Sequence, residues 1–404
     1  MKKNLCMAVA VAIAAALALA ACAGKGQMTD KEVLMKIYED LNGKNWGERF
    51  NKNWGSELPL DEWYGVEVNE EGRVTKLSLS SDSVKGNVPA EIKYLTELKA
   101  FKVTVNNKGT THDKAIPAEV WQLPHLKELR LYEYCGKGMQ SEIPSEVNLP
   151  ELELLYTNIQ YADMAPLCHI ATLSTLSMSD FNGAIPEEIC QLTNLTELSL
   201  RAIEGLNGAV PNSIGKLTRL VKLEITADGK GQSGFAFPSA VWNLSGIKWL
   251  TLRNVSGLQS QIPASKVGEM KQLTSMSIIQ CGLNGPIPPQ LFTASGDLLV
   301  IDLTNNALTG EIPAEVGHAA KLSNLMLSNN DLGGTIPASL GNCNDLRVLT
   351  IKNNPKLGGE IPASLGRCKK LAMFNLGHTA VSHNVPIPVR NLPKWNHIAT
   401  FLFM

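Results

Sequence analysis

The chain has 404 residues, of which 44% are hydrophobic and 19% are charged, and its formal net charge is −1. This near-neutral balance excludes the strongly basic character of nucleic-acid-binding proteins and gives no general attraction to anionic lipid. The composition is that of an ordinary soluble protein, so the order of the residues must carry the information about fold and function.

The first 21 residues are predicted to be an export signal. Lys2 and Lys3 precede an unbroken apolar run over residues 8–21, which is too short for a comfortable transmembrane helix. The run ends in Leu19-Ala20-Ala21-Cys22, which resembles the lipobox of bacterial lipoproteins. The resemblance implies cleavage before Cys22 and lipid attachment to it, so that acyl chains hold the protein on a membrane. An ordinary signal followed by a chance cysteine is the alternative.

Residues 22–28 are a short polar tether, and residues 29–73 are expected to cap one end of the fold. Thr29 and Glu32 have the spacing of a helix capping box, an amphipathic stretch follows, and Gly43 is expected to end this helix. Three tryptophans come next and are interpreted as the core of the cap, with a sugar-binding platform as the alternative: Trp46, Trp54 and Trp63.

From residue 74 onward the pattern Leu-x-x-Leu-x-Leu, or an apolar variant, recurs thirteen times at spacings of 21 to 28 residues. A period in the twenties predicts a solenoid in which each repeat contributes one strand to a parallel sheet. Because alternate residues of a strand share a face, the fourth and sixth positions point into the core, and the third, fifth and seventh point outward. The first positions are Val74, Leu98, Leu126, Leu152, Leu173, Leu195, Leu220, Ile247, Leu273, Leu298, Leu322, Leu346 and Leu371.

The second half of the repeat has the form Leu-x-Gly-x-Ile-Pro, most clearly at residues 308–313 and 332–337. This pattern resembles the plant-specific class of leucine-rich repeats, and the chain as a whole resembles bacterial lipoproteins that carry such repeats. The resemblance spans residues 74–379. It implies an α/β-type repeat solenoid: a superhelix with a parallel concave β-sheet, a second short strand near the glycine, and short helical or 3-10 turns on the convex side. Residues 380–404 are expected to form the C-terminal cap, with a sorting signal as the alternative.

The ninth position of a repeat usually carries asparagine, whose amide can satisfy buried backbone groups. Only four repeats keep it, and the repeat lengths vary most between residues 98 and 195, so we expect the middle of the chain to bend or bulge. The four asparagines are Asn106, Asn306, Asn330 and Asn354.

The cysteines leave two alternatives open. Cys168 and Cys190 occupy equivalent positions in adjacent repeats, as do Cys343 and Cys368, so each pair could form a disulfide after export. Small buried cysteines also serve as apolar filler between repeats. Cys135 and Cys281 have no such counterpart, and no cysteine spacing resembles a zinc site.

The outward positions of the sheet are where binding residues are expected. Exposed tyrosine, tryptophan and arginine dominate binding hot spots, although aromatic pairs across strands can also simply stabilise a sheet. These residue types gather between the third and eighth repeats, and the final repeats offer small or neutral groups. The predicted ligand-binding residues are Arg130, Tyr132, Tyr156, Arg201, Glu224, Trp249 and Arg253.

These observations predict a non-enzymatic, monomeric, membrane-anchored protein at the outer membrane or cell surface, with the periplasmic face as an alternative. Its seven histidines match no metal or catalytic pattern, and no metal, cofactor or nucleic acid is expected. The concave face is expected to bind a protein partner in adhesion or in host or community interaction. Glycan capture for nutrient uptake is the alternative, motivated by Tyr132, Tyr156 and Trp249.

Overall fold

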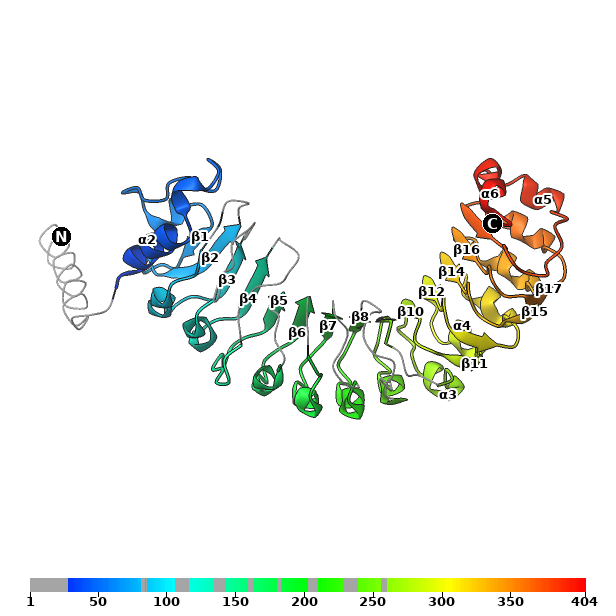
Figure 1. Cartoon of the computed structure of the whole chain (residues 1–404), viewed down its shortest axis with the longest axis horizontal. Coiled ribbons are helices and arrows are strands. Elements are labelled where there is room, and N and C mark those ends of the chain that lie inside the picture. The colour runs from blue at the N-terminus through cyan, green and yellow to red at the C-terminus, as the bar shows by residue number, and fades with distance from the viewer. Residues whose placement is uncertain are drawn as a thin grey trace, which may run out of the picture.

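The computed structural model describes residues 28–80, 84, 86–105, 116–133, 143–158, 163–179, 183–202, 210–227, 239–255 and 260–404. In Figure 1 they form one curved solenoid, with strands along the inner, concave side and short helical turns along the outer, convex side. The predicted signal, Cys22 and most of the tether lie outside the described residues, as do Asn106 and Cys135.

The concave side is a single sheet that follows chain order. β1 pairs antiparallel with β2, and every later pairing is parallel. Its strands in the described part of the chain are β1 (Val66–Val68), β2 (Val74–Ser80), β3 (Ala100–Val105), β4 (Glu128–Glu133), β5 (Leu154–Thr157), β6 (Thr175–Ser179), β7 (Glu197–Ala202), β8 (Lys222–Ala227), β9 (Trp249–Arg253), β10 (Ser275–Ile279), β12 (Val300–Asp302), β14 (Asn324–Met326), β16 (Val348–Thr350) and β18 (Met373–Asn375).

The convex side is built from single helical turns, most of which follow a proline, as the sequence predicts. Pro117 and Pro313, for example, take an extended backbone directly before a turn, where the missing N–H costs nothing. The turns are η3 (Ala90–Tyr94), η4 (Ala118–Gln122), η5 (Ala165–His169), η6 (Glu187–Gln191), η7 (Asn212–Lys216), η8 (Ser239–Asn243), α3 (Ala264–Val267), α4 (Gln290–Thr293), η9 (Ala314–His318), η10 (Ala338–Asn342), η11 (Ala363–Arg367) and α5 (Ile387–Arg390).

The first repeat is covered by α2 (Asp30–Asp40), η1 (Gly43–Asn45) and η2 (Leu60–Glu62). The predicted capping box is present, because Thr29 and Glu32 bond each other's backbone. Asp30 ties this helix to the sheet: its carboxylate accepts from the Val74 amide at 2.7 Å and from Arg73 at 3.0 Å. The helix ends earlier than expected, since Asn42, and not Gly43, takes the left-handed conformation after it.

Three tryptophans of this region pack together with Tyr38 as an aromatic cluster, and each donates its indole N–H to a backbone carbonyl. Trp46, Trp54 and Trp63 are at most 7% exposed. At the opposite end α6 (Trp395–Phe401) packs on β18, and Leu402 accepts a hydrogen bond from the Leu376 amide at 2.5 Å.

The asparagine ladder is confirmed in the repeats from residue 273 onward. Asn330 and Asn354 are buried, and each donates to carbonyls of its own and the preceding repeat while accepting from a backbone N–H. Second strands appear here too, in two small parallel pairs: β11 (Asn284–Pro286) with β13 (Ala307–Thr309), and β15 (Gly333–Thr335) with β17 (Lys356–Gly358).

The irregular middle of the chain does not interrupt the sheet. From β2 to β18 the strands pair in an unbroken parallel register, and the one register shift among the described pairings lies between β1 and β2. The predicted bulge in the middle is therefore wrong for the sheet. The varying repeat length is absorbed in the segments between strands.

The described cysteines are free thiols, so the structure has neither of the two conceivable disulfides. Cys343 and Cys368 are fully buried, and their thiols donate to carbonyls of the preceding repeat, Val316 at 3.4 Å and Leu340 at 3.5 Å. They act as apolar filler with a weak hydrogen bond.

Candidate functional site

The parallel register arranges the outward side chains of the sheet in rows that cross the strands. Each row takes one residue per strand, about 4.8 Å apart. From β4 to β9 the first row is Glu128, Leu154, Thr175, Glu197, Lys222 and Trp249, and the middle row is Arg130, Tyr156, Ser177, Ser199, Glu224 and Thr251. The last row contains Tyr132, Ser179, Arg201, Thr226 and Arg253.

Arg130, Tyr156 and Tyr132 form the first group of predicted site residues. Arg130 pairs in register with Tyr156, and its guanidinium carbon lies 4.2 Å from the centroid of that ring. The guanidinium also forms an ion pair with Glu128 on its own strand. A cation held between a carboxylate and an aromatic face is fixed in orientation, so this group offers a pre-formed, amphipathic surface.

The contacts within this group change the pKa values of Arg130 and Tyr132. Partial burial alone would lower the pKa of Arg130, but the ion pair with Glu128 outweighs it and the pKa is raised. Burial raises the pKa of the neighbouring Tyr132, and the positive charge of Arg130 opposes that change. Tyr132 is therefore a neutral hydrogen-bonding group at neutral pH.

Arg201 and Glu224 form the second group, on β7 and β8. Glu224 accepts from Arg201 Nε at 2.8 Å and from the Ser199 hydroxyl at 3.0 Å, and its side chain is 14% exposed. Lys222 lies 4.0 Å from the same carboxylate and bonds Glu197 at 2.6 Å. Burial would raise the pKa of Glu224, but the hydrogen bonds from Arg201 and Ser199 lower it overall. Glu224 thus fixes the orientation of the Arg201 side chain. Its own negative charge is balanced by Arg201 and Lys222.

Trp249 and Arg253 lie on the same face of β9, two positions from Thr251 in either direction. The indole of Trp249 is 45% exposed, and Arg253 is exposed with no ion-pair partner among the described residues. Tryptophan and arginine are both among the residue types that most often dominate protein interfaces, and here the two are exposed at opposite ends of one face of β9.

The structure places the predicted residues on two parts of the sheet, β4 and β5 on one side and β7 to β9 on the other. Tyr156 and Trp249 are four strands apart in the sheet, about 19 Å, and β6 between them presents Thr175, Ser177 and Ser179. Two expected outward residues are also shielded by their neighbours, since Asn158 is 6% and Ser199 3% exposed. Glu128, Glu197 and Lys222 complete the ion pairs although they are not among the predicted binding residues.

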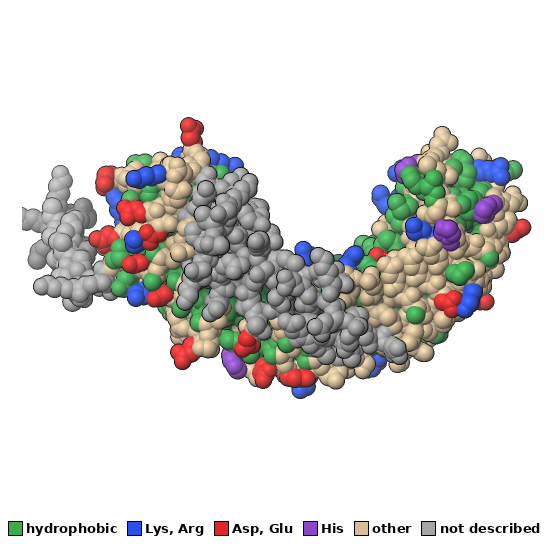
Figure 2. All heavy atoms as spheres, viewed as in Figure 1, with side chains coloured by type: hydrophobic (Ala, Val, Ile, Leu, Met, Phe, Trp, Pro, Cys, Tyr) green, Lys and Arg blue, Asp and Glu red, His purple; other side chains and the backbone are tan. Residues whose placement is uncertain are grey.

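The later strands present a different surface. Their outward residues are small or neutral, such as Ser275, Ser277, Asn324 and Thr350, with Asp302 as an acid and Met373 as an exposed apolar side chain. In Figure 2 this right-hand part of the solenoid shows a broad stretch with few charged side chains on its side wall. No cluster of metal-ligating residues and no helix long and apolar enough to cross a bilayer occurs within the described ranges.

Comparison with known proteins supports the fold. A family model described as Leucine Rich Repeat matches residues 321–343. A probable leucine-rich repeat receptor-like protein kinase of Arabidopsis thaliana is 38% identical over 64 residues, which cover 16% of this chain and 7% of the kinase. That match lies in the repeat region of the kinase, so it carries no catalytic domain with it.

Solved structures show the same architecture over most of the chain. The plant peptide hormone receptor RGFR1 in complex with RGF2 is 21% identical with a TM-score of 0.64, and the match covers 85% of this chain and 60% of the receptor chain. A leucine-rich repeat protein of Leptospira interrogans is 22% identical with a TM-score of 0.55, covering 79% of this chain and 76% of the other. The protein is thus a leucine-rich repeat solenoid similar in fold to these two proteins, and it spans less than two thirds of the receptor chain.

Proposed function

We propose that the protein is a non-enzymatic, membrane-anchored binding protein whose concave face engages a protein partner through strands β4–β9. The observation that carries the proposal is that exposed Trp249 and Arg253 share the outward face of β9, two strands from the pre-oriented Arg201, with no ion-pair partner for Arg253 among the described residues; the Arg130–Tyr156 stack lies further along the same sheet. These are the residue types that anchor protein interfaces, and they occupy one half of the sheet. Adhesion and host or community interaction are the settings that such a surface would serve.

The experiment is site-specific photo-crosslinking of the full chain on intact cells. A photo-reactive amino acid at Thr251, between Trp249 and Arg253, is expected to capture a discrete protein partner. The matched control places the same group at Thr350, which occupies the same row on β16. Equal capture from both positions, or from neither, contradicts a binding site on β9.

Glycan capture is the second candidate, favoured by the aromatic side chains Tyr132, Tyr156 and Trp249, since aromatic rings stack on sugars. A glycan array with the full chain tests it directly. The double variant Tyr156→Ala and Trp249→Ala should abolish whichever binding is found. If Met373→Ala, which removes an equally exposed side chain from the same row of β18, has the same effect as the double variant, the aromatic residues are not the site.

Anchoring through Cys22 belongs to the same proposal and rests on the lipobox-like Leu19-Ala20-Ala21-Cys22. Cells fed a radiolabelled fatty acid should label the wild-type protein and leave Cys22→Ser unlabelled. Protease treatment of intact cells then distinguishes a surface-exposed protein, which is cleaved, from a periplasmic one, which is protected.

A further inference from the structure

One repeat lacks the helical turn on the convex side. Every described segment between successive strands of the parallel sheet contains a 3-10 or α-helical turn, except the segment between β4 and β5. The cause is a deletion: the spacing from Ile116 to Leu126 in the preceding repeat is one residue longer than that from Ile143 to Leu152. Val147-Asn148-Leu149 replaces Val120-Trp121-Gln122-Leu123, so nothing corresponds to the fully buried Trp121.

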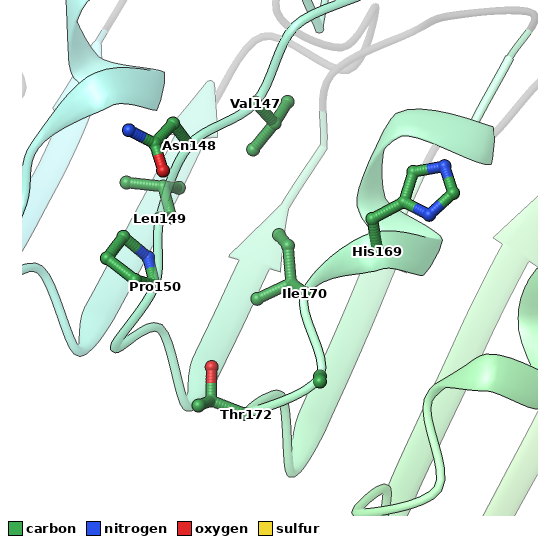
Figure 3. Close-up of a pocket in the computed structure, with 8 residues that line it drawn as sticks. Val147, Asn148, Leu149, Pro150, His169, Ile170 and Thr172 are labelled. Atoms are coloured by element: carbon green, nitrogen blue, oxygen red, sulfur yellow. The ribbon is translucent and has the colours of Figure 1, made fainter.

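The missing turn leaves a cavity of about 270 Å³, which we call the β4–β5 cavity. Figure 3 shows its two walls, the extended segment Val147–Pro150 on one side and His169 and Ile170 at the end of η5 on the other. The first wall is tied to the preceding turn η4: the Asn148 backbone N–H donates to the Trp121 carbonyl oxygen at 2.9 Å, and the Gln122 side-chain amide donates to the Glu146 carbonyl oxygen at 2.9 Å.

The cavity has an apolar floor and a polar opening. Leu149 and Ile170 are almost fully buried beneath it, and Pro150 lies exposed at its edge. The side chains of Asn148 and His169 are exposed and have no hydrogen-bond partner among the described residues. The volume lies below that of pockets for drug-sized ligands, about 300–1,000 Å³, and suits a single side chain.

The surrounding convex surface is acidic. Exposed carboxylates lie close in sequence to the lining residues, at Glu146 before Val147 and at Asp163 before η5, and on the next turn, η6, at Glu187 and Glu188. None has an ion-pair partner within the described residues. Burial raises the pKa of Cys168 on η5 to about 12, and the negative charges of Glu188 and Asp163 contribute, which places both carboxylates near this turn. Figure 2 likewise shows acidic side chains along the lower, convex edge in this part of the solenoid.

We propose that the β4–β5 cavity binds an arginine side chain of a second protein partner. Arginine combines an apolar stem, which fits the floor formed by Leu149 and Ile170, with a planar guanidinium that only donates hydrogen bonds. Asn148 lines the cavity and Glu146 directly precedes its first wall, and neither the Asn148 Oδ1 nor the Glu146 carboxylate accepts a hydrogen bond from another described residue. The cavity lies on the opposite side of the sheet from Trp249 and Arg253, so this contact is independent of binding at the concave face.

The test is fluorescence anisotropy of the full chain in detergent with a short labelled peptide of alternating glycine and arginine. The same peptide with citrulline in place of arginine keeps the shape and removes the charge. We expect the citrulline peptide to bind at least about tenfold more weakly. Equal affinity for the two peptides would overturn the proposal.

Two variants locate the binding. Asn148→Trp introduces a side chain as large as Trp121 of the preceding repeat and should abolish peptide binding. If this variant folds, as judged by circular dichroism, and still binds the peptide like wild type, the cavity is not the binding site. Glu146→Gln should weaken binding about two- to fivefold at low salt. Its matched control is Glu315→Gln, at the same position after Ile-Pro in a repeat that keeps its turn, η9. A loss of affinity in Glu315→Gln as large as in Glu146→Gln would mean non-specific attraction and overturn the assignment.

Discussion

The regular half of the solenoid (residues 273–379) and the irregular half (residues 98–255) share one sheet but differ in what holds the segments between strands. In the regular half Asn306, Asn330 and Asn354 link the backbones of successive repeats, and second strands pair beside them. In the irregular half the sequence keeps asparagine at this position only at Asn106, and its strands carry the arginines and aromatic residues. The other repeats of that half have Tyr134, Gln160, Phe181, Ile203, Asp228 and Val255 there. The comparison shows that the parallel sheet forms wherever the apolar core positions are kept. The asparagine ladder is therefore not required for the sheet, and repeats without it still present outward side chains on regular strands.

The largest effect is expected from Asn354→Val, which places in the regular half the residue that Val255 provides at the same repeat position in the irregular half. Asn354 is fully buried, so its loss leaves the Leu332 amide and the Ile351 carbonyl unpaired and removes one of the two side-chain hydrogen bonds to the Leu327 carbonyl, which Asn330 also bonds. We expect a loss of about 2–4 kcal/mol of local stability. Hydrogen exchange at the Leu332 amide should accelerate by about 30-fold or more.

Asn324→Val is the control for this experiment, because Asn324 is a half-exposed asparagine on the outward face of β14. It should change the exchange rate at Leu332 by less than about twofold. Comparable exchange rates in the two variants would show that the ladder does not stabilise the regular half.

The second-largest effect is expected from removing a cation from the outward face of the irregular half, compared with removing one from the regular half. Arg253→Ala should weaken binding of a concave-face partner by about tenfold, because this guanidinium is exposed and has no ion-pair partner among the described residues. Lys352→Ala removes a cation from the corresponding position after β16 and should change affinity by less than about twofold. Titration calorimetry with the identified partner measures both, and a reversed order would move the site into the regular half.

A smaller effect is expected from the ion-pair group of the irregular half. The folded-state pKa of Glu224 lies below its ordinary value of 4.5, so the stability that it contributes is full above that value and is lost as pH falls through the lowered pKa. Glu224→Gln should cost about 1 kcal/mol at pH 7. Urea denaturation should show the gap from wild type closing as the pH is lowered toward 3. A gap that stays constant with pH would mean that packing, and not charge, is responsible.

The smallest effect concerns reactivity alone. Burial raises the pKa of Cys343 to about 12 and that of Cys368 to about 11, so neither thiol should react with iodoacetamide at pH 8 in the folded protein. Cys190, which is only half-buried on η6, should be labelled. Peptide mass spectrometry before and after denaturation measures this, and rapid native labelling of Cys343 would show that the regular half opens readily.

Much of this molecule follows from the spacing of its residues. The leucine positions predict the strands, and alternation places Arg130, Glu224 and Trp249 outward as the structure has them. The contacts between outward residues do not follow, because they depend on which rotamer spans adjacent strands: Arg201 reaches Glu224 diagonally, although its partner in register is Thr226.

The structural effect of unequal repeat lengths does not follow from the sequence. Unequal repeat lengths suggested a bulged sheet, whereas the parallel pairing constrains the strands and the differences fall in the connecting segments. The one-residue deletion before Leu149 is visible in the printed sequence, and its consequence, an absent turn and a cavity, depends on how the neighbouring turns η4 and η5 pack. The binding residues themselves stay predictions.

The antiparallel strand β1 has a consequence for how copies of the protein can meet. It occupies the start of the sheet with only three residues, and Glu67 on it is paired with Lys76 of β2. A further parallel strand therefore finds a short, reversed and charged edge in place of another repeat, and α6 lies over β18 at the far edge. Both ends thus discourage end-to-end polymerisation, which keeps a protein built from self-complementary units at a fixed length.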